Sequence, residues 1–544
     1  MWRFLYPFGS FIAGFTLMGF EIIASRVIAP LVGNSLYSWA SVISVILFGL
    51  SFGAWLGGKL ADKEKHTESL VYIFLVSSFF IALVPIISLV LEILPPFSGI
   101  IISSLVYAVV LFLPASFTLG MIQPLLLKEY VSSFHTIGQR YGMLSMLWSL
   151  GSILGVLLMG FVFISFFGTT VILFGLSVLC LLYSSCIIIH KKELLTKKYF
   201  VYCILSLLLV TILYFVFIYL HTTNTLSATI FEKDTGYYHL KIVDSNLPEF
   251  GFSRSLFLDY DIHSIEQQNF VPFLYTNVFP VFGILSPNPK NILVIGAGAY
   301  TVPKNISSYY KTSVDVLEID NELPAIAKKY FGYDENTIHT TTSEARLFLR
   351  TDKKIYDIIY GDAYNSFISI PWYLTTQEYY KLTKSKLSKN GICVMSFVAS
   401  KNPTDVQFLQ SMFTTFTSVY PTTYVFSFIK PSERVGNFFF IGMKTDEEKM
   451  SEEELKSQLR KLGKYSFLRE MVLTSPEIHA LFASSTFPQN NTVLHDDYAP
   501  VESLMKPIVI SYFKEYSLFV SYIKKQIPDF KGEVLGNTLF FKAF

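Results

Sequence analysis

The stretch NILVIGAGAY (291–300), followed by VDVLEID (314–320), decides the fold of the second half of this chain. NILVI is a short, continuous apolar run, which is typical of a strand buried in a parallel sheet. GAGAY then turns the chain, and VDVLEID is a second buried strand that ends in acids. YDIIYGD (356–362) and GICVMSFV (391–398) are further strands, separated by helix-compatible segments. This alternation predicts an α/β, Rossmann-like domain around a parallel sheet.

Ligands of such sheets bind at the carboxyl ends of the strands. Gly296, Ala297 and Gly298 follow the first strand, and glycine there permits a tight turn and a close approach of the backbone to a ligand. Glu318 ends the second strand, 22 residues after Gly296, where an acid can accept hydrogen bonds from ribose hydroxyls. The third glycine of the dinucleotide-binding pattern is absent, because Thr301 follows GAGAY. The spacing therefore predicts a nucleoside site without a seat for the pyrophosphate of NAD or FAD.

Further positions extend this predicted pocket. Ile319 follows Glu318, and Glu344 and Ala345 lie in SEAR at the start of the next helical segment. Glu344 is predicted either to face an adenine edge or to be an acid that stabilises a helix start. Asp362 ends the YDIIYGD strand. A carboxylate at that point can orient or deprotonate a nucleophile, and the alternative is a solvated loop aspartate.

The composition sets the broad class of the protein. Of 544 residues, 52% are hydrophobic and only 15% are charged, with a mean hydropathy of +0.46. This charge deficit excludes an ordinary soluble enzyme for the whole chain, and 51 Phe with 33 Tyr exclude disorder. Four cysteines without a C-x-x-C pair give neither a disulfide framework nor a zinc site, and we expect no metal. A net charge of +2 gives no basis for binding nucleic acid.

The charges are concentrated in the second half of the chain. Residues 1–220 contain 18 charged residues, against 66 in 221–544. A bilayer core needs about 20 apolar residues per helix. Seven stretches meet this requirement: 5–28, 36–58, 70–94, 100–127, 141–166, 169–190 and 199–220. The sequence therefore predicts a multi-pass integral membrane protein, placed in the cell membrane, with the lipid bilayer as a partner.

Basic residues predict the orientation of the bundle. They cluster before the first stretch and in every second loop after it: Arg3, Lys59, Lys63, Lys65, Lys128, Arg140, Lys191, Lys192, Lys197 and Lys198. The positive-inside rule places that side in the cytoplasm. With seven spans, the soluble half is then predicted to lie outside.

Several residues inside the predicted spans stand out. Glu21 and Arg26 are charged within the first one, where charge is costly. Glu21 is predicted to be a structural partner or a ligand contact, and Arg26 a side chain that reaches the interface. Small residues permit close helix packing, and two groups of glycines carry this prediction: Gly53, Gly57 and Gly58, and Gly151, Gly155 and Gly160.

The chain is predicted to have four parts. Residues 1–222 form the bundle, and 223–288 form a small antiparallel β domain, because Tyr, Phe, Ile and Val occur there in short runs broken by turn residues. Residues 289–515 form the α/β domain, which begins at the turn-rich SPNPKN (286–291). Residues 516–544 are a tail.

The order and spacing of these segments resemble the polyamine aminopropyltransferases, the spermidine synthase family. The chain is most similar to the membrane-fused branch, which has a major-facilitator-like bundle at its N-terminus. The bundle segments that carry the resemblance are GFEIIASRVIAPLVGNSLYSWA (19–40), GAWLGGKLADK (53–63) and YGMLSMLWSLGSILG (141–155). The soluble segments are DTGYYHLKIVD, LFLDYDIHS, NILVIGAGAY, VLEID, SEARLFL, YDIIYGDAYNS, YLTTQEYY and HDDYAPVE.

This resemblance implies a methyltransferase-like α/β fold and a transfer reaction. The family moves an aminopropyl group from decarboxylated S-adenosylmethionine to a diamine and releases methylthioadenosine, which implies a small-molecule amine as substrate here. Glu318 then holds the ribose, Glu344 the adenine, and Asp362 the attacking amine. The substrate positions implied are Tyr238, His263, Tyr275 and Asn365. Ala299 stands where the family has an acid that grips the aminopropyl ammonium.

Other functions stay open at this point. The soluble half is alternatively a degenerate nucleoside-binding or regulatory module without catalysis, or a methyltransferase-like enzyme that uses S-adenosylmethionine. A transporter is a third reading, and a homodimer is left open. The segment HDDYAPVE (495–502) is predicted either to line the cleft or to fasten the C-terminal segment to the sheet.

Overall fold

The computed structural model divides into two compact units, Met1–Leu240 and Lys241–Phe544, which are described separately. The described residues are 4–63, 66–93, 100–131, 136–191, 197–224, 229–247, 251–259, 261–267, 274–286, 288–364, 370–400, 402–427, 435–445, 454 and 492–508.

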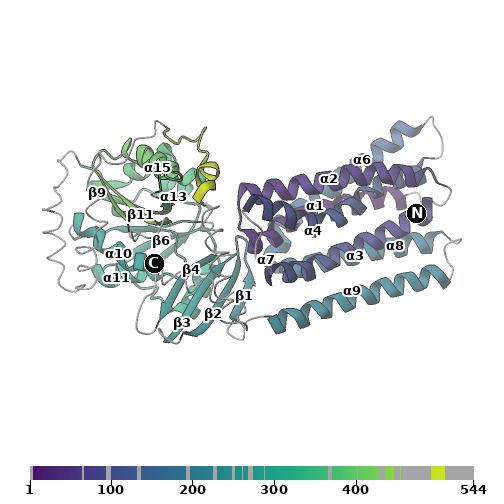
Figure 1. Cartoon of the computed structure of the whole chain (residues 1–544), viewed down its shortest axis with the longest axis horizontal. Coiled ribbons are helices and arrows are strands. Elements are labelled where there is room, and N and C mark those ends of the chain that lie inside the picture. The colour runs from purple at the N-terminus through teal and green to yellow at the C-terminus, as the bar shows by residue number, and fades with distance from the viewer. Residues whose placement is uncertain are drawn as a thin grey trace. The chain divides into compact units, whose positions relative to one another are not determined.

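The first unit is a bundle of long helices (Figure 1). The helices are α1 (Leu5–Val32), α2 (Leu36–Ala61), α3 (His66–Ile93), α4 (Ile100–Gly120), α5 (Ile122–Tyr130), α6 (Ile137–Leu158), the π-helix η3 (Met159–Phe163), α7 (Ile164–Phe166), α8 (Thr169–His190) and α9 (Lys197–Asn224). Seven helices within the described residues are long and apolar enough to cross a membrane. They coincide with the seven predicted stretches.

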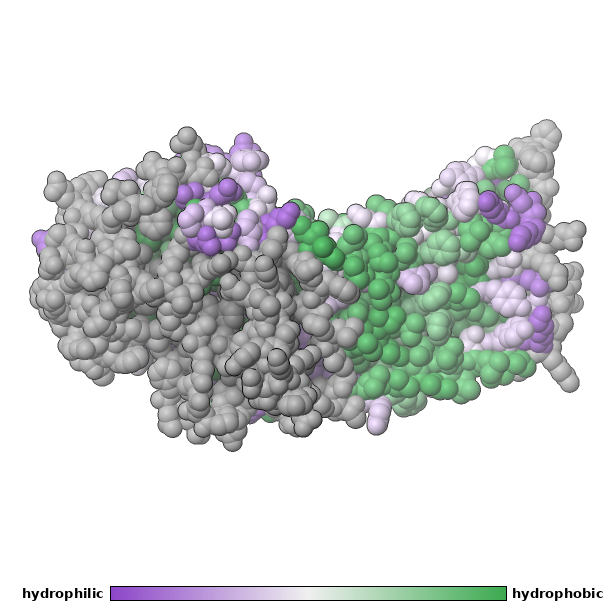
Figure 2. Space-filling model, viewed as in Figure 1, coloured by the Kyte–Doolittle hydropathy of each residue, from purple (hydrophilic) through white to green (hydrophobic). Residues whose placement is uncertain are grey.

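The outer surface of the bundle is apolar. Figure 2 shows hydrophobic residues along the helices and hydrophilic ones gathered at the end that carries the N-terminus. Large side chains such as Leu47, Phe48 and Trp55 are more than half exposed. An apolar patch of this extent on a protein surface indicates contact with something other than water. The pattern is compatible with a multi-pass membrane protein.

Glycines bring pairs of helices into backbone contact. A Cβ on Gly53 of α2 would lie 2.1 Å from the Phe117 carbonyl oxygen of α4. A Cβ on Gly151 of α6 would lie 2.1 Å from a carbonyl oxygen of α1. Around Gly58 and Gly160, by contrast, nothing among the described residues lies within 4 Å. Only part of each predicted glycine group therefore makes a close contact.

The charged residues of α1 have different surroundings. Arg26 donates a hydrogen bond to the carbonyl oxygen of Gly236, in the turn between β1 (Thr229–Asp234) and β2 (His239–Leu247). The Asp234 carboxylate accepts a hydrogen bond of 2.8 Å from the Thr169 N–H at the start of α8. The β1–β2 turn is thus fastened to the bundle and belongs to the first unit. Glu21 is half-buried, and its Oε2 has no hydrogen-bond partner among the described residues.

Two sheets carry the soluble part of the chain. The smaller sheet has the order β1-β2-β3-β4, with β3 at Gly251–Leu258 and β4 at Asp261–Gln267, and β3 pairs antiparallel with β4. The larger sheet has the order β10-β11-β9-β8-β5-β6-β7. Its strands are β5 (Ile292–Ile295), β6 (Val314–Glu318), β7 (Ile338–Thr342), β8 (Tyr356–Gly361), β9 (Leu387–Ser400), β10 (Thr423–Ser427) and β11 (Val435–Met443).

Helices alternate with the strands of the larger sheet. They are α10 (Leu274–Phe282), η5 (Gly283–Leu285), α11 (Thr301–Tyr310), α12 (Leu323–Phe331), α13 (Ala345–Thr351), η6 (Trp372–Leu374), α14 (Gln377–Ser385) and α15 (Gln407–Thr417). The order of strands and helices confirms the predicted Rossmann-like, methyltransferase-like fold.

The larger sheet is mixed rather than wholly parallel. β5 to β9 pair in parallel, whereas β11 pairs antiparallel with both β9 and β10. The prediction of a parallel sheet therefore holds for five strands only. The length of the connection explains the antiparallel pairing of β10 and β11. The few residues between these strands suffice for a hairpin but not for a parallel crossover.

A single methyl group tests the glycine contacts. Gly53→Ala places a Cβ against the Phe117 carbonyl oxygen, and such overpacking costs roughly 1–3 kcal/mol. We expect a lower melting temperature for the detergent-solubilised variant. Gly58→Ala in the same helix is the matched control, because nothing described lies within 4 Å of it. Equal melting of the two variants would contradict the close packing of α2 on α4.

Candidate active site

The turn after β5 needs glycine at two positions. Gly296 has φ of +90° and Gly298 has φ of +50°, in the region that L side chains rarely adopt. A Cβ on Gly296 would lie 2.4 Å from the Asp362 carbonyl oxygen, and one on Gly298 would lie 2.9 Å from the Ser264 Oγ. The turn is thus closed in by the end of β8 on one side and by β4 on the other.

Glu318 holds the other side of this turn. The residue is only 6% exposed. Its carboxylate accepts hydrogen bonds of 3.0 Å from the Ala297 N–H and from the Asp320 N–H, and the Ile319 N–H also contacts it. Burial raises the pKa of Glu318 to about 7, and these N–H groups oppose the rise. A carboxylate has about four acceptor sites, so these N–H groups leave capacity for a further donor.

Asp362 follows the end of β8. Its N–H donates a hydrogen bond of 2.9 Å to the Ile295 carbonyl oxygen at the end of β5, and the Ser396 hydroxyl bonds its carboxylate. Burial raises the pKa of Asp362 to about 7, against the effect of that hydroxyl. Because β8 and β6 are the two neighbours of β5, Asp362 and Glu318 flank the glycine turn from opposite sides.

Strand β4 also reaches the turn. Its Ser264 hydroxyl accepts a hydrogen bond of 3.0 Å from the Ala299 N–H. The carbonyl oxygen of His263 would lie 3.7 Å from a Cβ on Gly298. Burial lowers the pKa of His263 to about 4, so its ring is neutral near pH 7. The structure therefore brings the strand of His263 to the predicted nucleoside turn.

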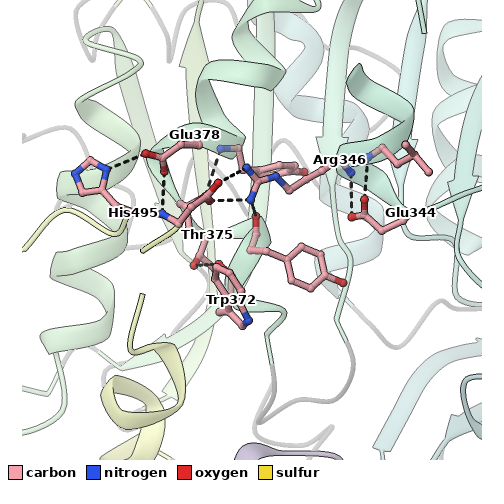
Figure 3. Close-up of polar contacts among 11 residues, drawn as sticks. Glu344, Arg346, Trp372, Thr375, Glu378 and His495 are labelled. Carbon is pink, nitrogen blue, oxygen red and sulfur yellow. Dashed lines mark hydrogen bonds and ion pairs between the residues drawn. The ribbon is translucent and has the colours of Figure 1, made fainter. Parts of the chain in front are cut away.

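Glu344 caps the helix that it precedes. Its carboxylate accepts hydrogen bonds of 3.0 Å from the Arg346 N–H and 2.8 Å from the Leu347 N–H (Figure 3). This is the geometry of the helix-start acid, one of the two predicted roles. Ala345 is the buried first residue of α13. A contact between Glu344 and adenine stays a prediction.

The HDDY segment is tied to the α/β domain. Arg346 donates to both carboxylate oxygens of Asp496 at 2.7 and 2.6 Å, and the Thr376 hydroxyl donates to the same carboxylate at 2.8 Å. His495 and Glu378 are 3.0 Å apart in the same network (Figure 3). These bonds connect residues up to 150 positions apart. They match the predicted fastening role of this segment.

The remaining predicted substrate positions stay predictions. Tyr238 belongs to the first unit, next to the β1–β2 turn, and is 9% exposed. The side chain of Tyr275 and the whole of Asn365 lie outside the described residues. Among the described residues, no group of three or more His, Cys, Asp or Glu side chains is placed to hold a metal ion.

Two contacts of the site were missed by the sequence reasoning. Ser396 bonds Asp362 from β9, and Ser264 bonds the turn from β4. Ser264 directly follows His263 in the segment LFLDYDIHS, which only weakly indicates a role at the site. Ser396 lies in an apolar run, and nothing in the sequence around it indicates a role.

Together the residues of the site form a turn between two buried carboxylates, Glu318 and Asp362, each with a pKa of about 7. This arrangement suits hydroxyl recognition on one side and proton transfer on the other.

Comparison with known proteins identifies the family of this domain. Residues 275–452 match the spermine/spermidine synthase domain. A polyamine aminopropyltransferase of Lachnospira eligens is 28% identical over 218 residues, which cover 39% of this chain and 74% of that protein. One of Vibrio vulnificus is 35% identical over 126 residues, 22% of this chain and 41% of that protein. The second half of the chain therefore contains a spermidine synthase domain, which belongs to a family of transferases, as the motifs predict.

Solved structures were compared as well. A probable spermidine synthase from Corynebacterium glutamicum is 16% identical with a TM-score of 0.38, covering 50% of this chain and 97% of that one. The spermidine synthase of Thermotoga maritima is 18% identical with a TM-score of 0.37, covering 46% of this chain and 86% of that one.

The raised pKa of Asp362 predicts a pH dependence of stability. The folded protein keeps this carboxyl protonated up to about pH 7, whereas the unfolded chain ionises it near pH 4. Between those values the unfolded state binds fewer protons, so stability falls as the pH rises. We expect Asp362→Asn to flatten this fall, measured as melting temperature between about pH 4 and about pH 7.

Asp357→Asn is the matched control, at the opposite end of β8. The Asp357 carboxylate accepts hydrogen bonds from the N–H groups of Lys290 and Asn291, which hold its pKa below the usual value. This variant should keep the wild-type slope across the window. An unchanged slope in Asp362→Asn would show that Asp362 does not titrate near pH 7.

Proposed function

We propose that the protein is a membrane-anchored aminopropyltransferase that uses decarboxylated S-adenosylmethionine and a small primary amine. The observation that carries the proposal is the pair of buried carboxylates, Glu318 and Asp362, on opposite sides of the glycine turn. The spermidine synthase domain at residues 275–452 supports the same reaction. The relatives that share it are named polyamine aminopropyltransferases.

Glu318 is assigned to the ribose of the donor. Its two oxygens already accept backbone N–H groups, which fix the carboxylate in place. A ribose hydroxyl then donates to the acceptor capacity that remains. Hydrogen bonds to the charged form lower the pKa of a carboxyl. Binding of the nucleoside therefore favours the ionised form of Glu318. Ala297, Gly298 and Ile319 provide the adjoining backbone wall.

Asp362 is assigned to the acceptor amine. The amine nitrogen attacks the carbon of the aminopropyl group that is bonded to the sulfonium. A new N–C bond forms, the S–C bond breaks, and its electron pair neutralises the sulfur to give methylthioadenosine. The proton released from nitrogen passes to Asp362. A carboxylate with a pKa near the working pH is well matched to this step, and burial brings Asp362 to about 7.

Membrane attachment is the second part of the proposal. Seven apolar helices among the described residues support it. The basic residues Lys59, Lys128 and Lys191 favour a cytoplasmic position for the end of the bundle that carries the N-terminus. The soluble half is then on the outer side. Protease digestion of intact and opened spheroplasts tests this, because an outer domain is cleaved in both and an inner one only after opening.

The reaction is tested by methylthioadenosine release. Purified full-length protein in detergent, given decarboxylated S-adenosylmethionine and a panel of primary amines, should release methylthioadenosine. We expect Asp362→Asn to lower kcat by roughly a hundredfold to ten-thousandfold, the usual contribution of a positioned base. Activity of the wild type should rise as the pH passes through about 7, because the base must be ionised.

Asp357→Asn on the same strand is the control, since that carboxylate bonds backbone at the other end of β8. It should keep wild-type turnover. Folded protein that releases no methylthioadenosine with any amine would refute the proposed activity. Binding of methylthioadenosine without turnover would instead favour the regulatory module.

A further inference from the structure

A small cavity lies beside Asp362. It is formed at the end of β8 and at residues 395–397 within the neighbouring strand β9, on which α14 and α15 pack. Gly361 and Ala363, the chain neighbours of Asp362, line it, as does Ser396, whose hydroxyl bonds the Asp362 carboxylate. Its free volume of about 20 Å³ is enough for one water-sized group.

Two of the residues that line this cavity are buried tyrosines. Tyr379 and Tyr380 line it, and each is 0% exposed. Neither hydroxyl has a hydrogen-bond partner among the described residues. The Tyr379 hydroxyl lies 3.9 Å from where a Cβ on Gly361 would be. It is therefore close to the last residue of β8. A buried hydroxyl without a partner is costly, so a small polar group in the cavity would be stabilised there.

No charged side chain of the described residues lines the cavity. Its lining residues include no Asp, Glu, Lys or Arg, and residues 363–376 contain no second acid. Three nearby carboxylates are already bonded within the protein: Glu344, Glu378 and Asp496. Of these three described carboxylates and Asp362, Asp362 is therefore the one beside this cavity that is left for a ligand cation.

We propose that the acceptor is a short amino alcohol, with one cationic nitrogen and a hydroxyl at its far end. This rests on the aminopropyl transfer proposed above. The ammonium pairs with Asp362 and gives up a proton to this carboxylate, which frees the nitrogen lone pair for attack. The far hydroxyl enters the cavity and bonds the Tyr379 hydroxyl. A diamine would bury its second ammonium in the same cavity without a counter-charge, which is strongly unfavourable.

Three acceptors of equal length test the proposal. Aminobutanol, diaminobutane and pentylamine differ only in the far group, which is a hydroxyl, an ammonium or a methyl. Full-length protein in detergent is given decarboxylated S-adenosylmethionine and each acceptor, and methylthioadenosine release is measured. We expect kcat/KM for aminobutanol to exceed that for diaminobutane at least tenfold, equivalent to about 1.4 kcal/mol, and to exceed that for pentylamine.

A conservative variant assigns the effect to the tyrosine. Tyr379→Phe should bring the ratio of aminobutanol to pentylamine activity close to one, and Tyr380→Phe is the second variant should the first not fold. Tyr420→Phe is the matched control, because Tyr420 is equally buried, bonds Thr383 at 2.9 Å and does not line the cavity. It should keep the wild-type ratio.

The outcomes separate the two proposals. A preference for diaminobutane, or a ratio unchanged in both tyrosine variants, overturns the amino alcohol while the transferase stands. Release with other amines of the panel but with none of these three acceptors also overturns the amino alcohol, and absence of methylthioadenosine with every amine tested overturns the transferase itself.

Discussion

The turn after β5 depends on one constraint, namely that its backbone must fit between the end of β8 and the carboxylate of Glu318. Gly296 lies so close to the Asp362 carbonyl oxygen that a Cβ has no room there, and the next N–H is bonded to Glu318. A side chain at Gly296 would push the turn away from β8 and break that bond. The distance between the two acids is thus set by backbone contact rather than by flexible side chains.

This constraint also accounts for the electrostatics. Both acids are held in the protein interior at the ends of the two strands that flank β5, and burial brings each pKa to about 7. A carboxylate in such a place is costly unless it is hydrogen-bonded. Glu318 is compensated by backbone N–H groups, and Asp362 mainly by one serine hydroxyl. Glu318 is therefore the more firmly fixed of the two, whereas Asp362 has capacity left for an amine.

The parts of the fold with a local signal were predictable. Short apolar runs identified β5, β6 and β8, since burial on both faces of a strand leaves a continuous hydrophobic pattern. The glycine turn and the acids after β6 and β8 followed from the rule that ligands meet strand ends. The seven apolar helices followed from length and composition alone.

Features that depend on distant neighbours were not predictable. Gly53 and Gly58 look alike in the sequence, yet only Gly53 meets another helix. Ser396 gains its role from lying beside Asp362 on the adjacent strand. The bond between Arg346 and Asp496 joins residues 150 positions apart. Glu344 was ambiguous because a helix cap and a ligand acid have the same sequence signature.

The most direct test of the account is calorimetric binding of methylthioadenosine to the full-length protein and to Glu318→Gln. A hydrogen bond to a charged group contributes about 1.5–3 kcal/mol, so the variant should bind at least about tenfold more weakly. Asp315→Asn, on the same strand but paired with Lys354 at 2.6 Å, should bind like the wild type. Equal affinity of Glu318→Gln and wild type, or no binding by folded wild-type protein, would contradict the nucleoside site.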